Sequence, residues 1–413
     1  MFASAIIANK RDSQILSREE IEFMINGYVS EAVPDYQMSA WAMAVLCRGM
    51  NKQEIADLTE CMLNSGIRLQ RATERPRVDK HSTGGLGDKT SLILAPLLAC
   101  YDLDVPMLSG RGLGITGGTL DKLESLAGYR CNLSAAEIEL QLQAIGCVIT
   151  GTTPEITPAD RKLYGLRDVT GTVPSIALIT ASIMSKKLAE SLDALVLDVK
   201  FGSGAFMRVR EDAEQLAESL VDTGNRMHVP TQAILSDMNQ PLGRMVGNAC
   251  EVNESLDILR GGGPSDTREL TLKLCAPLLV AAGKFTRDED ALQSLSKTLD
   301  SGAALQRFQQ MVEYQSGKFV DSLPLGKESI LESPLNGRLK QLDGQRVGQA
   351  VIALGGGRRK LSDQVDHQVG LEMLVRLGET VSIGQPLMRI FSRDSSTRQT
   401  AEQWLRSALT IEN

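Results

Sequence analysis

Cations and hydroxyl groups cluster around two glycine-rich segments of the sequence, residues 80–91 and 109–119. Glycine lets the backbone approach a ligand closely, and successive N–H groups in such loops form anion-binding concavities. Few carboxylates stand between the cationic and hydroxyl-bearing side chains, so the pattern predicts a site for a phosphate-like ligand. The residues that carry this prediction are Lys80, His81, Ser82, Ser91, Ser109 and Thr119.

Two common nucleotide-binding motifs are excluded at these segments. The P-loop pattern fails because Asp88 separates the last glycine of the first segment from the following Lys-Thr pair. Residues 112–117 match G-x-G-x-x-G, but a dinucleotide site also needs an acidic residue at the end of a second strand. Glu137 lies near the required distance inside a helix-like segment, so the dinucleotide interpretation is rejected.

The elements that must position these residues are predicted to form an α/β architecture. Short apolar runs alternate with helix-like stretches, which is typical of helices layered on a sheet. Glycines follow three apparent strands, at Gly110, Gly151 and Gly202, where open α/β sheets bind their ligands. The apolar runs are residues 91–99, 104–108, 146–150, 193–199 and 232–237.

Helices are predicted on either side of the first glycine-rich region. Ser17 with Glu20, and Asn51 with Glu54, have the spacing of capping boxes. We expect a discontinuous helical domain of residues 1–65 and 158–192. An α/β domain is expected at residues 66–157 and 193–333, and a small mixed, β-rich C-terminal domain at residues 334–413.

The run 38–47 is almost wholly apolar and must be buried against another segment or a second subunit. A homodimer through the helical domain is therefore expected.

Composition restricts the classes of function. The formal net charge of −7 over 413 residues argues against a nucleic-acid partner, which selects for a basic face. No apolar run is long enough to span a membrane, and the first residues carry too short an apolar stretch for a signal peptide. The cytoplasm is therefore the expected compartment.

Long, ungapped blocks resemble the signature blocks of the thymidine phosphorylase and pyrimidine nucleoside phosphorylase family. The blocks are VDKHSTGGLGDKTS (78–91), SGRGLGITGGTLDKLES (109–125), TPADRKLYGLRD (157–168), residues 179–207 and ALGGGRRKLSD (353–363). The resemblance implies a small helical lobe hinged to a larger α/β lobe. It also implies attack of inorganic phosphate on C1′ of a pyrimidine nucleoside, a reaction of nucleoside salvage that needs no metal or other cofactor.

The resemblance assigns roles residue by residue. Lys80, Ser82, Ser91, Ser109 and Thr119 match the phosphate-binding positions, and His81, Arg167, Ser182 and Lys186 match the pyrimidine-binding positions. His81 would act as general acid or as a hydrogen-bond donor to the base, while Arg167 and Lys186 would stabilise the departing pyrimidine anion. Leu113, Tyr164, Ile183 and Phe206 would form apolar walls. The phosphate-binding residues and His81 map to the α/β lobe, while Arg167, Ser182 and Lys186 map to the helical lobe. The two lobes are therefore expected to close over the substrates.

Three positions bear on how this chain differs from its relatives. Ile115 stands where relatives carry a histidine associated with the closed form. Met107 is typical of thymidine-selective relatives, so thymidine and deoxyuridine are the expected substrates, and a broader enzyme that also uses uridine is the alternative. Some relatives bind a cation near the first glycine-rich segment, but here Lys89 could take that charge role by pairing with Glu254, so no metal is expected.

Two more remote functions remain open. A phosphoribosyltransferase of the anthranilate type has a similar fold, and its magnesium would need acidic ligands, for which Asp121 and Glu124 are candidates. A non-catalytic ligand-binding relative is the second. Retention of the pyrimidine-binding set argues against both.

Overall fold

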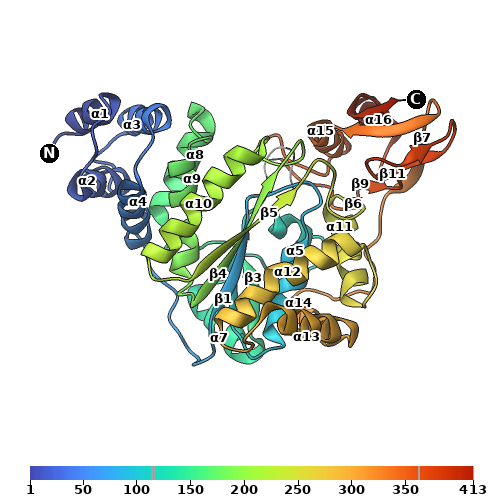
Figure 1. Cartoon of the computed structure of the whole chain (residues 1–413), viewed down its shortest axis with the longest axis horizontal. Helices are drawn as coiled ribbons and strands as arrows, with labels where there is room; N and C mark the ends of the chain where they lie inside the picture. Colours follow the sequence, from blue (N-terminus) through green and yellow to red (C-terminus); the bar gives the residue numbers. More distant parts are fainter. Residues whose placement is uncertain (113–114, 116, 361–362, 413) are drawn as a thin grey trace.

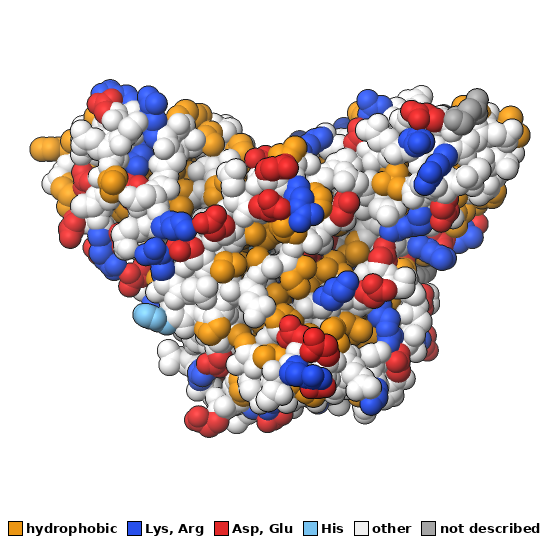
Figure 2. All heavy atoms as spheres, viewed as in Figure 1, with side chains coloured by type: hydrophobic (Ala, Val, Ile, Leu, Met, Phe, Trp, Pro, Cys, Tyr) orange, Lys and Arg blue, Asp and Glu red, His pale blue; other side chains and the backbone are white. Residues whose placement is uncertain are grey.

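The computed structural model describes residues 1–112, 115, 117–360 and 363–412. Figure 1 shows three parts: a helical lobe at the N-terminal end, a central α/β domain, and a C-terminal domain on the side away from the helical lobe. On the face drawn in Figure 2, the surface is hollowed between the helical lobe and the C-terminal domain.

The helical lobe combines N-terminal helices with two helices from the middle of the chain. Its core joins residues 3–62 to residues 159–181, with Trp41 fully buried. The expected capping boxes at Ser17 and Asn51 are both formed, each with the glutamate three residues later. The helices are α1 (Ala3–Arg11), α2 (Arg18–Val29), α3 (Asp35–Arg48), α4 (Lys52–Asn64), α8 (Pro158–Thr170) and α9 (Ile176–Ala189).

Parallel strands form the centre of the α/β domain. β1 (Val78–Ser82) pairs with β4 (Ala194–Phe201), which pairs with β5 (Thr231–Asp237), all in parallel. β2 (Val105–Leu108) pairs in parallel with β3 (Cys147–Thr150), and a parallel bridge between Arg77 and Asp104 joins the two groups. The order is therefore β3-β2-β1-β4-β5, and the carboxyl ends of these strands meet at one edge.

Helices cover both faces of this sheet. Successive residues of β4 alternate between the two cores: Val196 packs on one side, and Leu195 and Leu197 pack on the other. The covering helices are α5 (Thr90–Ala99), α6 (Thr119–Leu123), α7 (Ala135–Ile145), α10 (Arg210–Arg226), α11 (Asn248–Leu259), α12 (Ser265–Ala281), α13 (Asp288–Asp300) and α14 (Ala303–Tyr314).

One predicted strand is wrong. Residues 91–99 lie in helix α5, whose residues Thr90–Ala99 are all buried. A helix that is apolar all round lacks the 3.6-residue periodicity that distinguishes a helix, so a short apolar run of this kind is ambiguous in sequence. The other four runs contain strands β2, β3, β4 and β5.

The C-terminal domain contains two antiparallel sheets. The order of the first is β6-β9-β11-β7, and β6 (Met245–Val246) reaches it from the α/β domain. The second sheet has the order β10-β8-β12. The remaining elements are β7 (Lys327–Glu332), β8 (Gly337–Leu342), α15 (Gly344–Leu354), β9 (Gly370–Met373), β10 (Thr380–Val381), β11 (Pro386–Ser392), α16 (Ser395–Ala408) and β12 (Leu409–Glu412).

The predicted fold class is confirmed: a helical lobe, an α/β domain with a parallel sheet, and a mixed β-containing C-terminal domain. Among the described residues, no helix combines the length and the apolar character that crossing a membrane requires.

Candidate active site

A cavity of about 300 Å³ lies at the carboxyl ends of β1 and β2. All the predicted phosphate-binding residues line it: Lys80, Ser82, Ser91, Ser109 and Thr119. Lys80 and Ser82 belong to β1, Ser91 to the first turn of α5 and Thr119 to the start of α6, while Ser109 directly follows β2. Residues far apart in the sequence therefore converge because parallel strands end at the same edge.

Lys80 is the buried cation of this cavity. Its ammonium donates to Ser91 Oγ over 3.1 Å and lies 4.0 Å from the Asp88 carboxylate. Burial lowers the pKa of Lys80, and the negative charge of Asp88 opposes that shift. Bringing a phosphate next to Lys80 would add a second opposing charge and strengthen the charged form of the amine.

Asp88 would repel a phosphate if its charge were not balanced. Burial alone would raise the pKa of its carboxyl, but the charges of Lys200, Lys80 and Lys122 outweigh burial and hold that pKa well below its usual range. Lys200, at the end of β4, lies 3.8 Å from Asp88 and 2.7 Å from Asp198. Sequence reasoning missed Lys200 and Lys122. The available signal for Lys200 was a lysine near the end of a buried strand, two positions before Gly202.

One carboxylate bridges Gly112 and Gly118 in the second glycine-rich segment. The Asp121 carboxylate accepts hydrogen bonds from the backbone N–H of Gly112 over 2.6 Å and of Gly118 over 3.2 Å. The Lys122 ammonium donates to Asp88 O in the first segment and lies 3.0 Å from Glu251. The two glycine-rich segments are thus fixed to each other beside the cavity.

His81 lines the same cavity and is neutral at pH 7. Burial lowers the pKa of its imidazole well below 6.5, and the positive charges of Lys187, Lys186 and Lys80 lower it further. A neutral imidazole donates one hydrogen bond but holds no excess proton to give away. In the free protein His81 is therefore suited to hydrogen-bond donation, the second of its two predicted roles.

Most of the predicted pyrimidine-binding set lies apart from the phosphate residues. Tyr164 on α8 lines the cavity from the helical lobe. The Lys186 ammonium instead donates to Asp160 and to the backbone and side-chain oxygens of Ser182, all within the helical lobe.

Arg167 is 1% exposed and ties α8 to α9. Its guanidinium donates to the carbonyl groups of Thr172, Val173 and Leu178 over 3.3, 2.7 and 3.0 Å, and burial lowers its pKa.

The remaining predicted contacts to the nucleoside, the apolar walls and Met107, lie in several different places. Ile183 is buried in the core between α9 and the sheet, and Phe206 is exposed beyond β4. Met107 is 1% exposed and packs into the core beneath β2. Leu113 lies outside the described residues.

The two departures from the resemblance have structural counterparts. Ile115 contacts α15 of the C-terminal domain so closely that a Cβ added to Gly348 would lie 2.5 Å from the Cβ of Ile115.

The predicted pairing of Lys89 with Glu254 is present, and the Lys89 ammonium also donates to the carbonyl groups of Leu242 and Met245 over 2.8 and 3.1 Å. The ammonium group of Lys89 thus contacts a set of oxygens of the kind that binds a monovalent cation.

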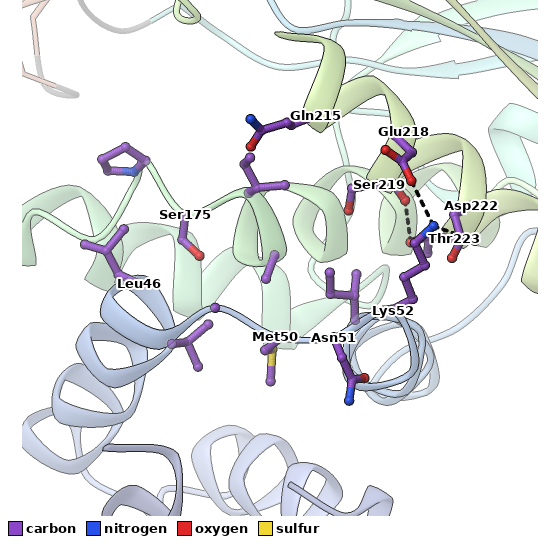
Figure 3. A pocket seen from close by; sticks show the side chains of 16 residues that line it. Leu46, Met50, Asn51, Lys52, Ser175, Gln215, Glu218, Ser219, Asp222 and Thr223 are labelled. Carbon is purple, nitrogen blue, oxygen red and sulfur yellow. Dashed lines mark hydrogen bonds and ion pairs between the residues drawn. The ribbon is translucent and has the colours of Figure 1, made fainter. Parts of the chain in front are cut away.

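A larger cavity of about 600 Å³ lies elsewhere, between the α3–α4 turn, the start of α9, and α10. Figure 3 shows Lys52 reaching from α4 toward Glu218 and Asp222 of α10, and its ammonium lies 2.8 and 3.8 Å from their carboxylates. None of the predicted site residues lines this cavity. The smaller cavity is the candidate active site because the cationic and hydroxyl groups converge there.

Fold and family models together define a class of enzyme, the glycosyl transferases. Residues 74–305 match the glycosyl transferase family, a/b domain, and residues 4–66 match its helical bundle domain. The fold resembles that of anthranilate phosphoribosyltransferase from Thermus thermophilus, with a TM-score of 0.62 and 17% identity over 76% of this chain and 99% of that chain. At that identity the likeness is one of fold.

The C-terminal domain and the relatives define the family more narrowly. Residues 338–412 match the pyrimidine nucleoside phosphorylase C-terminal domain. A pyrimidine-nucleoside phosphorylase of Staphylococcus haemolyticus is 46% identical over 94% of this chain and 91% of that protein. One of Staphylococcus aureus is 44% identical over 98% of this chain and 95% of that protein. The chain belongs to the pyrimidine nucleoside phosphorylase family, as its sequence blocks predicted.

Proposed function

We propose that the protein catalyses the reversible phosphorolysis of pyrimidine nucleosides. Phosphate oxygen attacks C1′ while the C1′–N1 bond breaks, giving the free pyrimidine and a pentose 1-phosphate. The observation that carries this proposal is the convergence of Lys80 and four hydroxyl side chains on one cavity, in a chain of this family. Positioning and electrostatic stabilisation are sufficient for such a transfer.

In the proposed site the α/β domain supplies the phosphate contacts and His81, and the helical lobe supplies the other polar contacts to the pyrimidine. Lys80, Ser82, Ser91, Ser109 and Thr119 hold the phosphate. In the other half of the site, His81, Arg167, Ser182 and Lys186 receive the pyrimidine, and the positive charges of Arg167 and Lys186 stabilise the leaving anion. Met107, Leu113, Tyr164, Ile183 and Phe206 shape the space around the nucleoside.

We propose a broad sugar range that includes uridine as well as thymidine and deoxyuridine. The relatives that support this range are described as pyrimidine-nucleoside phosphorylases, without restriction to thymidine. The narrower thymidine preference rested on Met107, and the burial of that side chain in the core weakens the argument.

Release of free base from each nucleoside tests the proposal. The purified protein is incubated with phosphate and thymidine, deoxyuridine or uridine, with and without magnesium, and free base is followed by absorbance. We expect all three nucleosides to be cleaved without added magnesium. Cleavage of the deoxynucleosides alone would establish the narrower specificity, and cleavage of none would contradict the proposed activity.

The carboxylates that a phosphoribosyltransferase would need for magnesium are otherwise engaged. Asp121 pairs with Arg358, and Glu124 pairs with Arg111. Among the described residues, no three His, Cys, Asp or Glu side chains are grouped to hold a metal ion.

We also propose a homodimer formed through the helical lobe. The lobe's own core covers one side of α3, including Met38 and Trp41, but Tyr36 and Met43 remain exposed at 74% and 41%. Phe2 beside α1 and Val169 on α8 are exposed as well. Analytical ultracentrifugation should give a mass near twice 44.7 kDa at micromolar concentration, and a mass near 44.7 kDa would rule the dimer out.

The division into units is a related proposal. We propose that the chain consists of three units: residues 1–65 with 158–192, residues 66–157 with 193–333, and residues 334–413. β7 pairs within the sheet of the C-terminal domain, which favours a start of the third unit near Lys327.

A further inference from the structure

An ion pair links the C-terminal domain to the phosphate half of the site. Arg358 follows the glycine run 355–357 after α15, and its guanidinium pairs with the Asp121 carboxylate of α6. The two side chains are only 10% and 3% exposed, and they lie 237 positions apart in the chain. Burial removes both charges from water. Loss of either partner therefore leaves an uncompensated buried charge, which is destabilising.

The Asp121 carboxylate uses its two oxygens for different partners. Oδ1 accepts from Arg358, whereas Oδ2 accepts from the N–H groups of Gly112 and Gly118 in the second glycine-rich segment. These two glycines lie against each other: a Cβ added to Gly118 would be 2.2 Å from Gly112 N. The predicted phosphate ligands Ser109 and Thr119 flank this closure on either side.

Arg358 is itself held in place. Its Nε donates to Asp363 O over 3.2 Å, and Asn248 of α11 donates to Gly356 O over 2.9 Å. The guanidinium therefore approaches Asp121 from a fixed backbone, which gives it one orientation. If Arg358 is removed, the Asp121 carboxylate keeps its two N–H donors but loses the partner that sets its rotamer.

We propose that Arg358 is a positioning residue for phosphate, acting through Asp121 on the second glycine-rich segment. By orienting Asp121, Arg358 fixes the separation of Gly112 and Gly118, and with it the hydroxyl groups of Ser109 and Thr119. This inference rests on the proposed function, in which those hydroxyls bind phosphate. It gives the C-terminal domain a direct part in binding one of the two substrates.

Steady-state kinetics of three variants test the inference: Arg358→Met, Arg358→Lys and the matched control Arg359→Met. Arg359 is the next residue and is exposed. For Arg358→Met we expect the KM for phosphate to rise about tenfold, since small displacements of ligand groups are costly, while the KM for nucleoside changes less than about twofold. Arg358→Lys should be intermediate, because it keeps the charge without the fork geometry. Arg359→Met should match the unaltered protein.

Calorimetric titration with inorganic phosphate alone separates this inference from the proposed activity. If the unaltered protein cleaves no nucleoside, the proposed function fails, yet weaker phosphate binding by Arg358→Met would still support the positioning role. An unchanged phosphate affinity and KM in Arg358→Met would overturn the inference. Equal rises in both KM values with a lower melting temperature would also overturn it, because that is the result of general loosening.

Discussion

At the scale of single residues, His81 is the side chain whose chemistry depends most on its surroundings. Burial and three neighbouring lysines keep its pKa well below 6.5. In the proposed reaction, the imidazole would stabilise charge on the departing base by donating a hydrogen bond rather than by transferring a proton. One such donor in a water-excluded site contributes roughly 10²–10³ in rate.

Amide substitutions at His81 distinguish these two roles. His81→Ala should lower kcat about 10²-fold, because the donor is lost. His81→Asn places an amide N–H near the position of Nδ1, and His81→Gln places one near Nε2. One of these two should retain most of the activity in a phosphorolysis assay. Equal loss in all three variants would indicate that a transferable proton is required.

The same pKa shift predicts lability to acid. In the unfolded chain the imidazole takes up a proton near pH 6.5, whereas the folded protein binds it only at lower pH. The unfolded state therefore binds more protons below pH 6.5, and stability falls as the pH decreases through that range. Thermal unfolding from pH 8 to 5.5 should show a smaller loss for His81→Asn, which has no proton to bind. Parallel curves for the two proteins would contradict the assignment.

At the scale of elements, Lys89 joins the first glycine-rich loop to α11. Gly87 has φ +73°, and a Cβ there would lie 2.7 Å from Leu242 O, so the loop must pass close to the strand that precedes α11. The Lys89 ammonium then reaches Glu254 and two carbonyl groups, with both charged side chains almost fully buried. This contact fixes the far end of the loop that carries predicted phosphate ligands.

Removing both members of this pair should cost less stability than the two single losses added together. Lys89→Met leaves the Glu254 carboxylate buried without a partner and should destabilise the fold by about 3–5 kcal/mol. Glu254→Gln should do likewise, and the double variant should lose less than the sum of the two. Urea unfolding measures all three, and strictly additive losses would show that the buried charges do not interact.

Local sequence rules predicted the elements where a short-range signal exists. The boxes Ser17–Glu20 and Asn51–Glu54 each start a helix, because cap and partner are three residues apart. The converging phosphate residues followed from motifs at strand ends. The helical state of 91–99 could not be predicted, since its burial depends on packing from distant helices. The charge balance at Asp88 likewise depends on lysines more than 30 positions away, such as Lys122.

At the scale of the whole molecule, the two halves of the proposed site lie in different lobes. Lys186 satisfies its donors within the helical lobe, through Asp160 and Ser182, while the phosphate residues line the cavity in the α/β domain. Only Tyr164, of the predicted pyrimidine-side residues in the helical lobe, reaches that cavity. We expect one lobe to move toward the other when Lys186 contacts the substrate.

X-ray scattering should detect that movement. With phosphate and free pyrimidine base both present, so that no turnover occurs, we expect a smaller radius of gyration than for the free protein. Lys186→Met, which lacks the proposed cationic contact to the base, should remain at the larger value under the same conditions. Superimposable profiles with and without both ligands would show that the lobes do not close.

The short strand β6 makes the C-terminal domain difficult to separate from the rest of the chain. β6 belongs to the segment before α11, yet it completes the antiparallel sheet by pairing with β9. A truncation ahead of β7 would leave the N–H and C=O groups of β6 unpaired, and it would expose the apolar side chains of Leu242 and Val246. A fragment that stops there would expose an unpaired strand edge beside apolar side chains. Protease digestion or shortened expression products should therefore yield aggregates instead of a soluble fragment.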